Sequence, residues 1–131
     1  MIILDTHILV WLVTQAEKLS RPAASAIRRA RVSDGLSIAD VTVWELASLF
    51  ARGTLQALGT VENTVQNLLD RSGVTIKPIT SEIASLATQF PPDYPRDPVD
   101  RLIGATARAE GLALVTRDEN IRKSPLLKTI W

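Results

Sequence analysis

Residues 96–118 read RDPVDRLIGATARAEGLALVTRD, and this stretch decides the fold. Apolar residues recur at helical spacing after Pro98. Gly111 is expected to end that helix, because glycine adopts the left-handed conformation that closes a helix at little cost. The apolar run 112–116 then predicts a short strand. A helix followed at once by a strand is the repeating unit of a parallel sheet.

Acidic residues stand at both ends of this unit. Asp97 and Asp100 flank the start of the helix, and Asp118 lies just past the strand. Helix N-termini favour negative charge, and open parallel sheets bind their ligands beyond the carboxyl ends of the strands. We therefore expect an active site where these carboxylates lie.

The same alternation of apolar strands and amphipathic helices runs through the rest of the chain. Strands are predicted at residues 2–4, 36–38, 74–76, 112–116 and 127–130. Helix starts are predicted at Asp5, Ser20, Asp40, Thr60, Thr80 or Ser81, and Pro98, with a short turn after Asp118. This pattern predicts an α/β fold with a central parallel sheet of about five strands and helices on both faces. Residues 1–131 are expected to form a single domain.

Composition narrows the class of protein further. Cysteine is absent, which excludes a disulfide framework and thiolate metal sites, and a reducing, cytoplasmic location is expected. The apolar N-terminus lacks a basic leader and carries Asp5, so we interpret it as a buried strand and not as a signal peptide. No apolar run is long enough to cross a membrane. The net charge is +1, so binding of a polyanion would require local clusters of Arg and Lys.

Four carboxylates occupy comparable places along the chain. Asp5 follows the first strand, Glu45 lies in the helix after the second, Asp100 opens the late helix and Asp118 follows the fourth strand. In a parallel sheet these places can converge on one edge. Carboxylates brought together repel each other unless a cation joins them. Oxygen ligands without cysteine or clustered histidine select Mg²⁺ or Mn²⁺ over zinc.

Each of these residues also has a purely structural interpretation. Asp97 before Pro98 is a good N-cap, and Asp100 suits the third position of a capping box. Asp5 is suited to cap the helix that follows it, and Asp118 is suited to a turn. For the lone His7, hydrogen-bonded packing is a more common role than catalysis.

Four segments in order carry a resemblance to a known family. They are MIILDTHILVWL (1–12), VTVWELASL (41–49), DPVDRLIGATARAEG (97–111) and LALVTRDENI (112–121). Together they resemble PIN-domain ribonucleases, and among these the VapC-type toxins of type II toxin–antitoxin modules. The resemblance implies an α/β/α sandwich and a Mg²⁺- or Mn²⁺-dependent endoribonuclease. Two positions depart from the family pattern: Ala39 stands where serine is common, and Val99 where an aromatic is common.

The resemblance assigns roles to individual residues. The catalytic acids implied are Asp5, Glu45, Asp100 and Asp118, of which Asp5, Asp100 and Asp118 bind metal directly or through water. Glu45 positions or deprotonates the attacking water, or completes the metal shell. The supporting residues implied are Thr6, Thr116 and Asp97. Whether one or two metal ions act is open at this point.

For substrate and partners, the sequence indicates only the class of molecule. The arginines nearest the acids in sequence are Arg96, Arg101, Arg117 and Arg122, and each suits either a substrate phosphate or an ion pair with a nearby acid. The resemblance implies RNA as substrate, a cognate antitoxin and a homodimer. A groove beside the large apolar residues Trp11, Trp44, Leu49, Phe50 and Leu55 would suit an amphipathic partner helix.

Two other classes of function remain open from the sequence. A receiver-type signalling domain also gathers acids and Mg²⁺ at strand ends, but it needs paired acids after the first strand, where this chain has Asp5-Thr6. A non-catalytic PIN-like scaffold that binds RNA or protein is the second alternative. Retention of all four acids argues against the scaffold, because unneeded buried carboxylates are costly.

Overall fold

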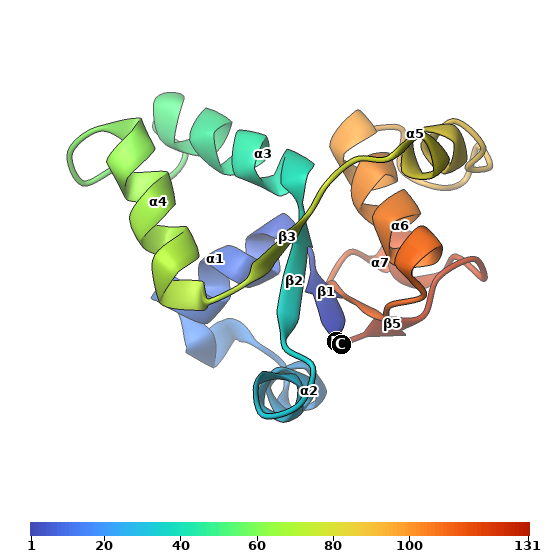
Figure 1. Cartoon of the computed structure of the whole chain (residues 1–131), viewed down its shortest axis with the longest axis horizontal. Helices are drawn as coiled ribbons and strands as arrows, with labels where there is room; N and C mark the ends of the chain where they lie inside the picture. Colours follow the sequence, from blue (N-terminus) through green and yellow to red (C-terminus); the bar gives the residue numbers. More distant parts are fainter.

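Five short parallel strands form the centre of the computed structural model, which describes residues 1–131 (Figure 1). The strands are β1 (Ile2–Leu4), β2 (Leu36–Ala39), β3 (Thr75–Lys77), β4 (Leu114–Val115) and β5 (Thr129–Ile130). Their order in the sheet is β3-β2-β1-β4-β5, and every neighbouring pair is parallel. The predicted α/β fold with five parallel strands is confirmed.

Helices cover both faces of this sheet. They are α1 (Thr6–Thr14), α2 (Arg21–Arg31), α3 (Asp40–Ala51), α4 (Val61–Ser72), α5 (Ser81–Ala87), α6 (Pro98–Glu110) and α7 (Glu119–Arg122), with a 3₁₀ turn at Ala16–Lys18. Figure 1 shows α1, α3 and α4 on one side of the strands, α5, α6 and α7 on the other, and α2 across the end where β2 begins. The predicted α/β/α sandwich is therefore present.

The strands explain this layering, because their side chains alternate between the two faces. Leu4 and Val115 belong to the core shared with α1, α2 and α4, whereas Ile3 and Leu114 belong to the core shared with α5, α6 and α7. All four side chains are fully buried. Because both faces of β1 and β4 are covered, neither strand carries a solvent-facing polar residue, and each is a continuous apolar run in the sequence.

Most predicted helix boundaries are confirmed. Ser20, Thr60 and Thr80 each accept a hydrogen bond from the backbone N–H three residues later, as N-caps do. Gly111 closes α6 with a φ of +65°. The prediction for Asp40 is wrong: Ala39 is the N-cap of α3, and the Asp40 carboxylate instead accepts the Ile79 N–H at 3.0 Å from the segment after β3.

The C-terminal elements differ from the sequence-based boundaries. The strands expected at 112–116 and 127–130 are only two residues long, because the sheet pairing is limited to Leu114–Val115 and Thr129–Ile130. The turn expected after Asp118 is the short helix α7. None of the helices is long and apolar enough to cross a membrane.

The strand order creates one special place at the sheet edge. From β1 the chain moves outward through β2 to β3, and then returns across β1 to continue with β4 and β5. The direction of winding therefore reverses between β1 and β4. In open parallel sheets the crevice at such a reversal, beyond the carboxyl ends of the strands, is the usual ligand site.

Candidate functional site

Asp5 lies at the point where the winding reverses. It follows β1 directly, is only 4% exposed, and caps α1 by accepting the Thr6 N–H at 2.9 Å through Oδ1. Its own N–H donates to the Val115 carbonyl at 3.0 Å, which extends the pairing of β1 with β4 by one residue. A nearly buried carboxylate in this position needs partners for both oxygens.

Thr116 supplies the second partner. Its hydroxyl donates to Asp5 Oδ2 at 2.7 Å and accepts the Asp118 N–H at 3.1 Å. One buried threonine thus links the acid after β1 to the acid after β4. The structure brings together Asp5, Thr116 and Asp118, as the sequence predicted.

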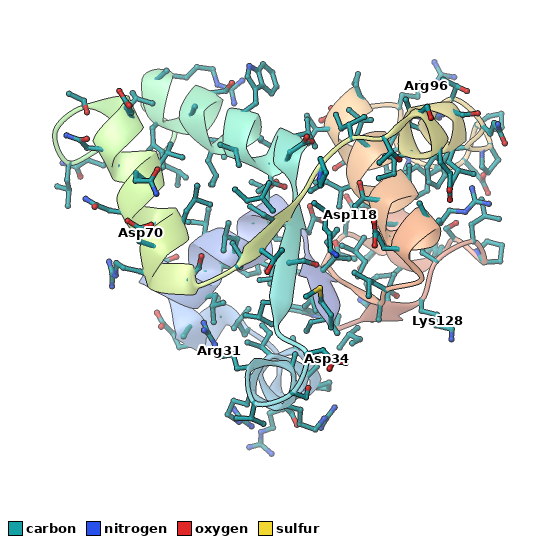
Figure 2. All side chains as sticks on the ribbon, in the orientation of Figure 1. Arg31, Asp34, Asp70, Arg96, Asp118 and Lys128 are labelled. Carbon is teal, nitrogen blue, oxygen red and sulfur yellow. The ribbon has the colours of Figure 1, made fainter.

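Asp118 has a structural role as well. Its Oδ1 accepts the N–H groups of Asn120 and Ile121 at 2.8 and 3.0 Å, which makes it the N-cap of α7. Figure 2 shows Asp118 between the central strands and α6, whereas Asp34 lies near α2 at the opposite end of the sheet. Because Oδ1 is engaged by the helix, Oδ2 is the oxygen that remains for a ligand.

Asp97 and Asp100 are three residues apart, but only Asp97 caps a helix. Asp97 is the N-cap of α6, with Oδ1 accepting the Val99 N–H at 3.0 Å. Asp100 lies three residues into the same turn, and the hydrogen bond of a capping box to Asp97 is not present. Burial, followed by the charges of Asp5, Asp97, Asp118 and Glu45, raises the pKa of Asp100 from 3.8 to about 7. Four other carboxylates therefore act on Asp100.

Glu45 reaches the same site from α3. Burial raises the pKa of Glu45 above its ordinary value. The charges of Asp5 and Asp97 also raise it, while the Thr6 side chain and His7 lower it in part. The Thr6 hydroxyl lies 3.1 Å from the Thr42 hydroxyl, so α1 and α3 are joined beside the acids.

Sequence reasoning missed Thr42 and Tyr94 as members of this region. Thr42 lies three residues before Glu45, so its place on the same helical face was a usable signal. The Tyr94 hydroxyl lies beside the acids, since it donates to the Asp100 carbonyl at 3.1 Å, and burial followed by the charges of Asp100, Asp5 and Asp118 raises its pKa. Nothing in the sequence pattern indicated that this tyrosine, in a proline-rich loop, would be buried there.

His7 packs against a neighbouring ring, but the hydrogen bond expected for its packing role is not formed. Its ring lies edge-on to Trp11 with ring centroids 5.1 Å apart. Nδ1 is 3.7 Å from Asp5 Oδ2, which is too long for a hydrogen bond. It is the only basic side chain that the structure places within ion-pair distance of the acids.

The four predicted arginines are placed differently from one another. Arg101 donates to the carbonyls of Pro95 and Phe90 at 2.9 and 3.2 Å, so its guanidinium is engaged by the loop before α6. Arg117 is exposed, and its guanidinium lies 5.8 Å from the Trp11 ring centroid. Arg96 and Arg122 are also exposed. The ion pairs with neighbouring acids that the sequence left open are not formed.

The donor set fits a hard divalent cation. The converging ligands are carboxylate and hydroxyl oxygens, and no Lys or Arg forms an ion pair with Asp5, Glu45, Asp100 or Asp118. Burial and, after it, the resulting excess of negative charge raise the pKa of Asp100, and a bound cation would relieve the repulsion. No group of three or more His, Asp or Glu side chains is already arranged to hold a metal ion. The fit therefore rests on donor chemistry and charge.

Fold and site together define a class of protein: a five-stranded parallel α/β/α protein with a cluster of acids where the strand order reverses. Residues 2–125 match the model of the PIN domain. The chain belongs to the PIN-domain family.

Several relatives support this assignment. The chain is 35% identical over 132 residues to Ribonuclease VapC22 of Mycobacterium tuberculosis, covering 99% of this chain and 98% of the relative. It has the fold of the toxin–antitoxin structure VapBC2 of Rickettsia felis bound to promoter DNA (TM-score 0.73, 19% identity, 98% and 97% of the two chains). It also has the fold of DNA-bound VapBC from Salmonella typhimurium (TM-score 0.71, 18% identity, 98% and 97% of the two chains).

The pKa of Asp100 leads to a prediction for stability against pH. Its folded-state pKa of about 7 lies above 3.8, so the folded protein binds this proton more tightly than the unfolded chain. The free energy of unfolding should therefore fall as pH rises from about 4 to about 7. Without metal, Asp100→Asn should remove the part of this fall that is due to Asp100 and should melt above the parent at pH 8. We expect a difference on the order of 1 kcal/mol, discounted because the side chain is partly exposed.

The measurement is thermal unfolding of both proteins in EDTA between pH 4 and pH 8. Glu45 contributes a fall in the same direction to both, so the difference between the two curves isolates Asp100. Parallel curves across this range would contradict the raised pKa.

Proposed function

We propose that this chain is a divalent-metal-dependent endoribonuclease that acts as the toxin of a type II toxin–antitoxin module. Membership of the PIN-domain family and 35% identity to a named ribonuclease along its whole length support this function. The observation that carries it is the convergence of Asp5, Asp100, Asp118 and Glu45 on one sheet edge without a basic partner for most of them. Mg²⁺ and Mn²⁺ are the ions best suited to such oxygen ligands.

Each residue has a distinct task in the proposed reaction. Asp5, Asp100 and Asp118 would hold the ion, which when bound neutralises charge on the phosphate and promotes ionisation of water. Thr116 keeps Asp5 Oδ2 in place through its hydroxyl. Glu45, whose pKa is raised, is suited to accept a proton from the attacking water near neutral pH.

The products follow from the balance of this hydrolysis. The water oxygen forms a bond to phosphorus, the bond from phosphorus to the 3′ oxygen breaks, and that oxygen takes up a proton. No 2′-hydroxyl takes part as nucleophile. We therefore expect fragments with 5′-phosphate and 3′-hydroxyl ends.

Cleavage of pooled cellular RNA tests the assignment of the acids. The parent should cut in Mg²⁺ or Mn²⁺ and stop in EDTA. Asp100→Asn keeps the shape of the side chain but removes its charge, so it should lower the rate by at least about a hundredfold with an unchanged circular dichroism spectrum. Asp97→Ser keeps an oxygen for the cap and should retain most activity. Full activity of Asp100→Asn with loss in Asp97→Ser would show that the wrong aspartate was assigned to the metal.

Among the arginines, Arg117 is the best placed for substrate phosphate. It directly follows Thr116 at the site, its guanidinium is exposed, and the Trp11 ring restrains it at 5.8 Å. A guanidinium restrained over an aromatic ring keeps its donors free for a phosphate and loses less freedom on binding. Arg101, by contrast, already uses two of its donors within the fold.

Arg117→Gln should weaken RNA binding about fivefold and leave the chemical step intact. Binding is measured in the Asp100→Asn background so that the RNA is not cut. Loss of one phosphate contact to a single strand should also reduce the slope of log affinity against log salt by about 0.7. Arg28→Gln, at an exposed arginine of α2, is the matched control and should bind like the parent. Equal effects of the two substitutions would exclude a specific role for Arg117.

A protein partner is the remaining part of the proposal. The similar solved structures include a toxin–antitoxin complex and DNA-bound VapBC structures, which supports a cognate antitoxin for this chain. Beside α1, α3 and α4 lie two adjoining pockets that share Phe50 and Leu68, and together we call them the α1–α4 groove. Trp11 and Leu55 line one pocket and Leu58 lines the other, with polar residues among them. Three of the five residues predicted for such a groove line it; Trp44 is exposed elsewhere on α3, and Leu49 is not part of the lining. An amphipathic helix is the expected occupant.

Leu58→Glu tests this partner without disturbing the core, because Leu58 is 79% exposed. It should lower affinity for the cognate antitoxin by at least about tenfold, since a buried charge opposes an apolar contact. Val32→Glu, at an 88% exposed position away from the groove, is the control. Light scattering on the isolated chain tests the proposed homodimer. A strict monomer at high concentration would count against the dimer, and equal antitoxin affinities would count against the groove.

A further inference from the structure

Two buried aromatic side chains anchor the proline-rich loop that leads into α6. Phe90 and Tyr94 are 6% and 2% exposed, and their rings stack with centroids 4.0 Å apart and an interplanar angle of 20°. Connecting loops normally run over the surface. The burial of both rings therefore attaches this loop to α6, whose first turn carries Asp100.

Gly104, in the middle of α6, makes room for the tyrosine. A Cβ at this position would collide with Tyr94 Oη and would lie 3.0 Å from Phe90 Cζ. Glycine inside a helix is destabilising relative to alanine, and the backbone here is ordinary right-handed helix, so no unusual φ requires it. The reason for the glycine is the close approach of the Tyr94 ring to the helix backbone.

The tyrosine hydroxyl acts on Asp100 directly. It donates a hydrogen bond to the Asp100 carbonyl at 3.1 Å. On the other side, Arg101 donates to the loop carbonyls of Pro95 and Phe90. The N-cap Asp97 holds the Val99 N–H. The backbone around Asp100 is thus restrained by the loop and by the cap as well as by the helix, and the Tyr94 hydroxyl is the side-chain group bonded to Asp100 itself.

The carboxylate of Asp100 lacks comparable restraints. No hydrogen bond of the structure involves it, whereas Asp5, Asp97 and Asp118 each accept one or more. It also faces the negative charge of those three residues and of Glu45. Because this carboxylate has no hydrogen bond of its own, its position depends on how firmly its backbone is held.

We propose that Tyr94 is a positioning residue for the metal site: its hydroxyl, seated against Gly104, fixes the Asp100 backbone so that the carboxylate points at Asp5 and Asp118. This inference rests on the proposed metal-dependent nuclease function. It adds a residue that makes no contact with the ion or the RNA. Removing such a support characteristically lowers metal affinity or activity about 10- to 100-fold.

Tyr94→Phe isolates the hydroxyl and keeps the stacked ring. The affinity for Mn²⁺, measured by calorimetric titration without RNA, should fall about tenfold. With RNA, kcat should fall at a fixed Mn²⁺ concentration below saturation, while KM for RNA stays within about twofold. Excess Mn²⁺ should restore most of kcat, because the ligand is displaced and not removed.

Thr106→Val is the matched control. Thr106 is a fully buried residue of α6 whose hydroxyl donates to the Leu102 carbonyl at 2.7 Å, away from Asp100. This variant also loses one buried hydroxyl bonded to a helix carbonyl, so it reports the cost of general destabilisation. It should melt lower than the parent and keep the parent's Mn²⁺ affinity.

Gly104→Ala provides a second, independent variant. Helix propensity alone would raise its melting temperature. Because the new methyl displaces the Tyr94 ring, we expect the melting temperature to fall and Mn²⁺ to bind at least as weakly as in Tyr94→Phe. A rise in melting temperature with unchanged Mn²⁺ affinity would overturn the proposed fit.

The results of these experiments distinguish failure of the Tyr94 positioning role from failure of the proposed nuclease function. An active parent with a Tyr94→Phe variant of equal Mn²⁺ affinity overturns the positioning role alone. Equal loss of Mn²⁺ affinity in Tyr94→Phe and Thr106→Val also overturns it, because the effect would then be general. A parent that neither binds Mn²⁺ nor cuts RNA overturns the proposed function and this inference together.

Discussion

The site depends on the parallel pairing of β1 with β4. That pairing puts Ile3 opposite Leu114 and Leu4 opposite Val115, so the next residues, Asp5 and Thr116, meet just beyond the strands. The 2.7 Å hydrogen bond between them joins residues 111 positions apart in the sequence. A shift of one residue in this register would turn the side chains of β4 to the wrong faces of the sheet and separate the two polar residues. The apolar cores on both faces therefore fix the geometry of the acids.

The acids serve the fold and the proposed chemistry at the same time. Asp5, Asp97 and Asp118 each cap a helix through one carboxylate oxygen, and Asp5 uses its second oxygen for Thr116. The capping interpretation and the ligand interpretation of these residues are therefore compatible. Asp100 and Glu45 are the exceptions, because neither caps a helix. Burial raises the pKa of both, and no capping interaction offsets that cost, so the proposed chemistry is the role that accounts for them.

Short-range patterns in the sequence predicted most of this arrangement. The apolar runs at 2–4 and 36–38 and the caps Ser20 and Thr60 depend on neighbours within a few residues, and these predictions are confirmed. Asp40 was assigned wrongly as a cap because its partner, the Ile79 N–H, is 39 residues away. The approach of Tyr94 to Gly104 was not visible either, because it depends on how a loop folds back onto a helix. The grouping of the acids came from their places after strands together with the family resemblance.

The wide sequence separation across β1 and β4 also bears on how the chain is made. Synthesis proceeds from the N-terminus, so Asp5 leaves the ribosome long before the residues that complete its surroundings. The central strand β1 can pair early with β2, but its other edge stays open until Leu114 and Val115 have emerged. A nascent chain consequently has no assembled acidic site during most of its translation. For a protein whose proposed substrate is RNA, this order of assembly would delay cleavage until the chain has nearly left the ribosome and the message that encodes it.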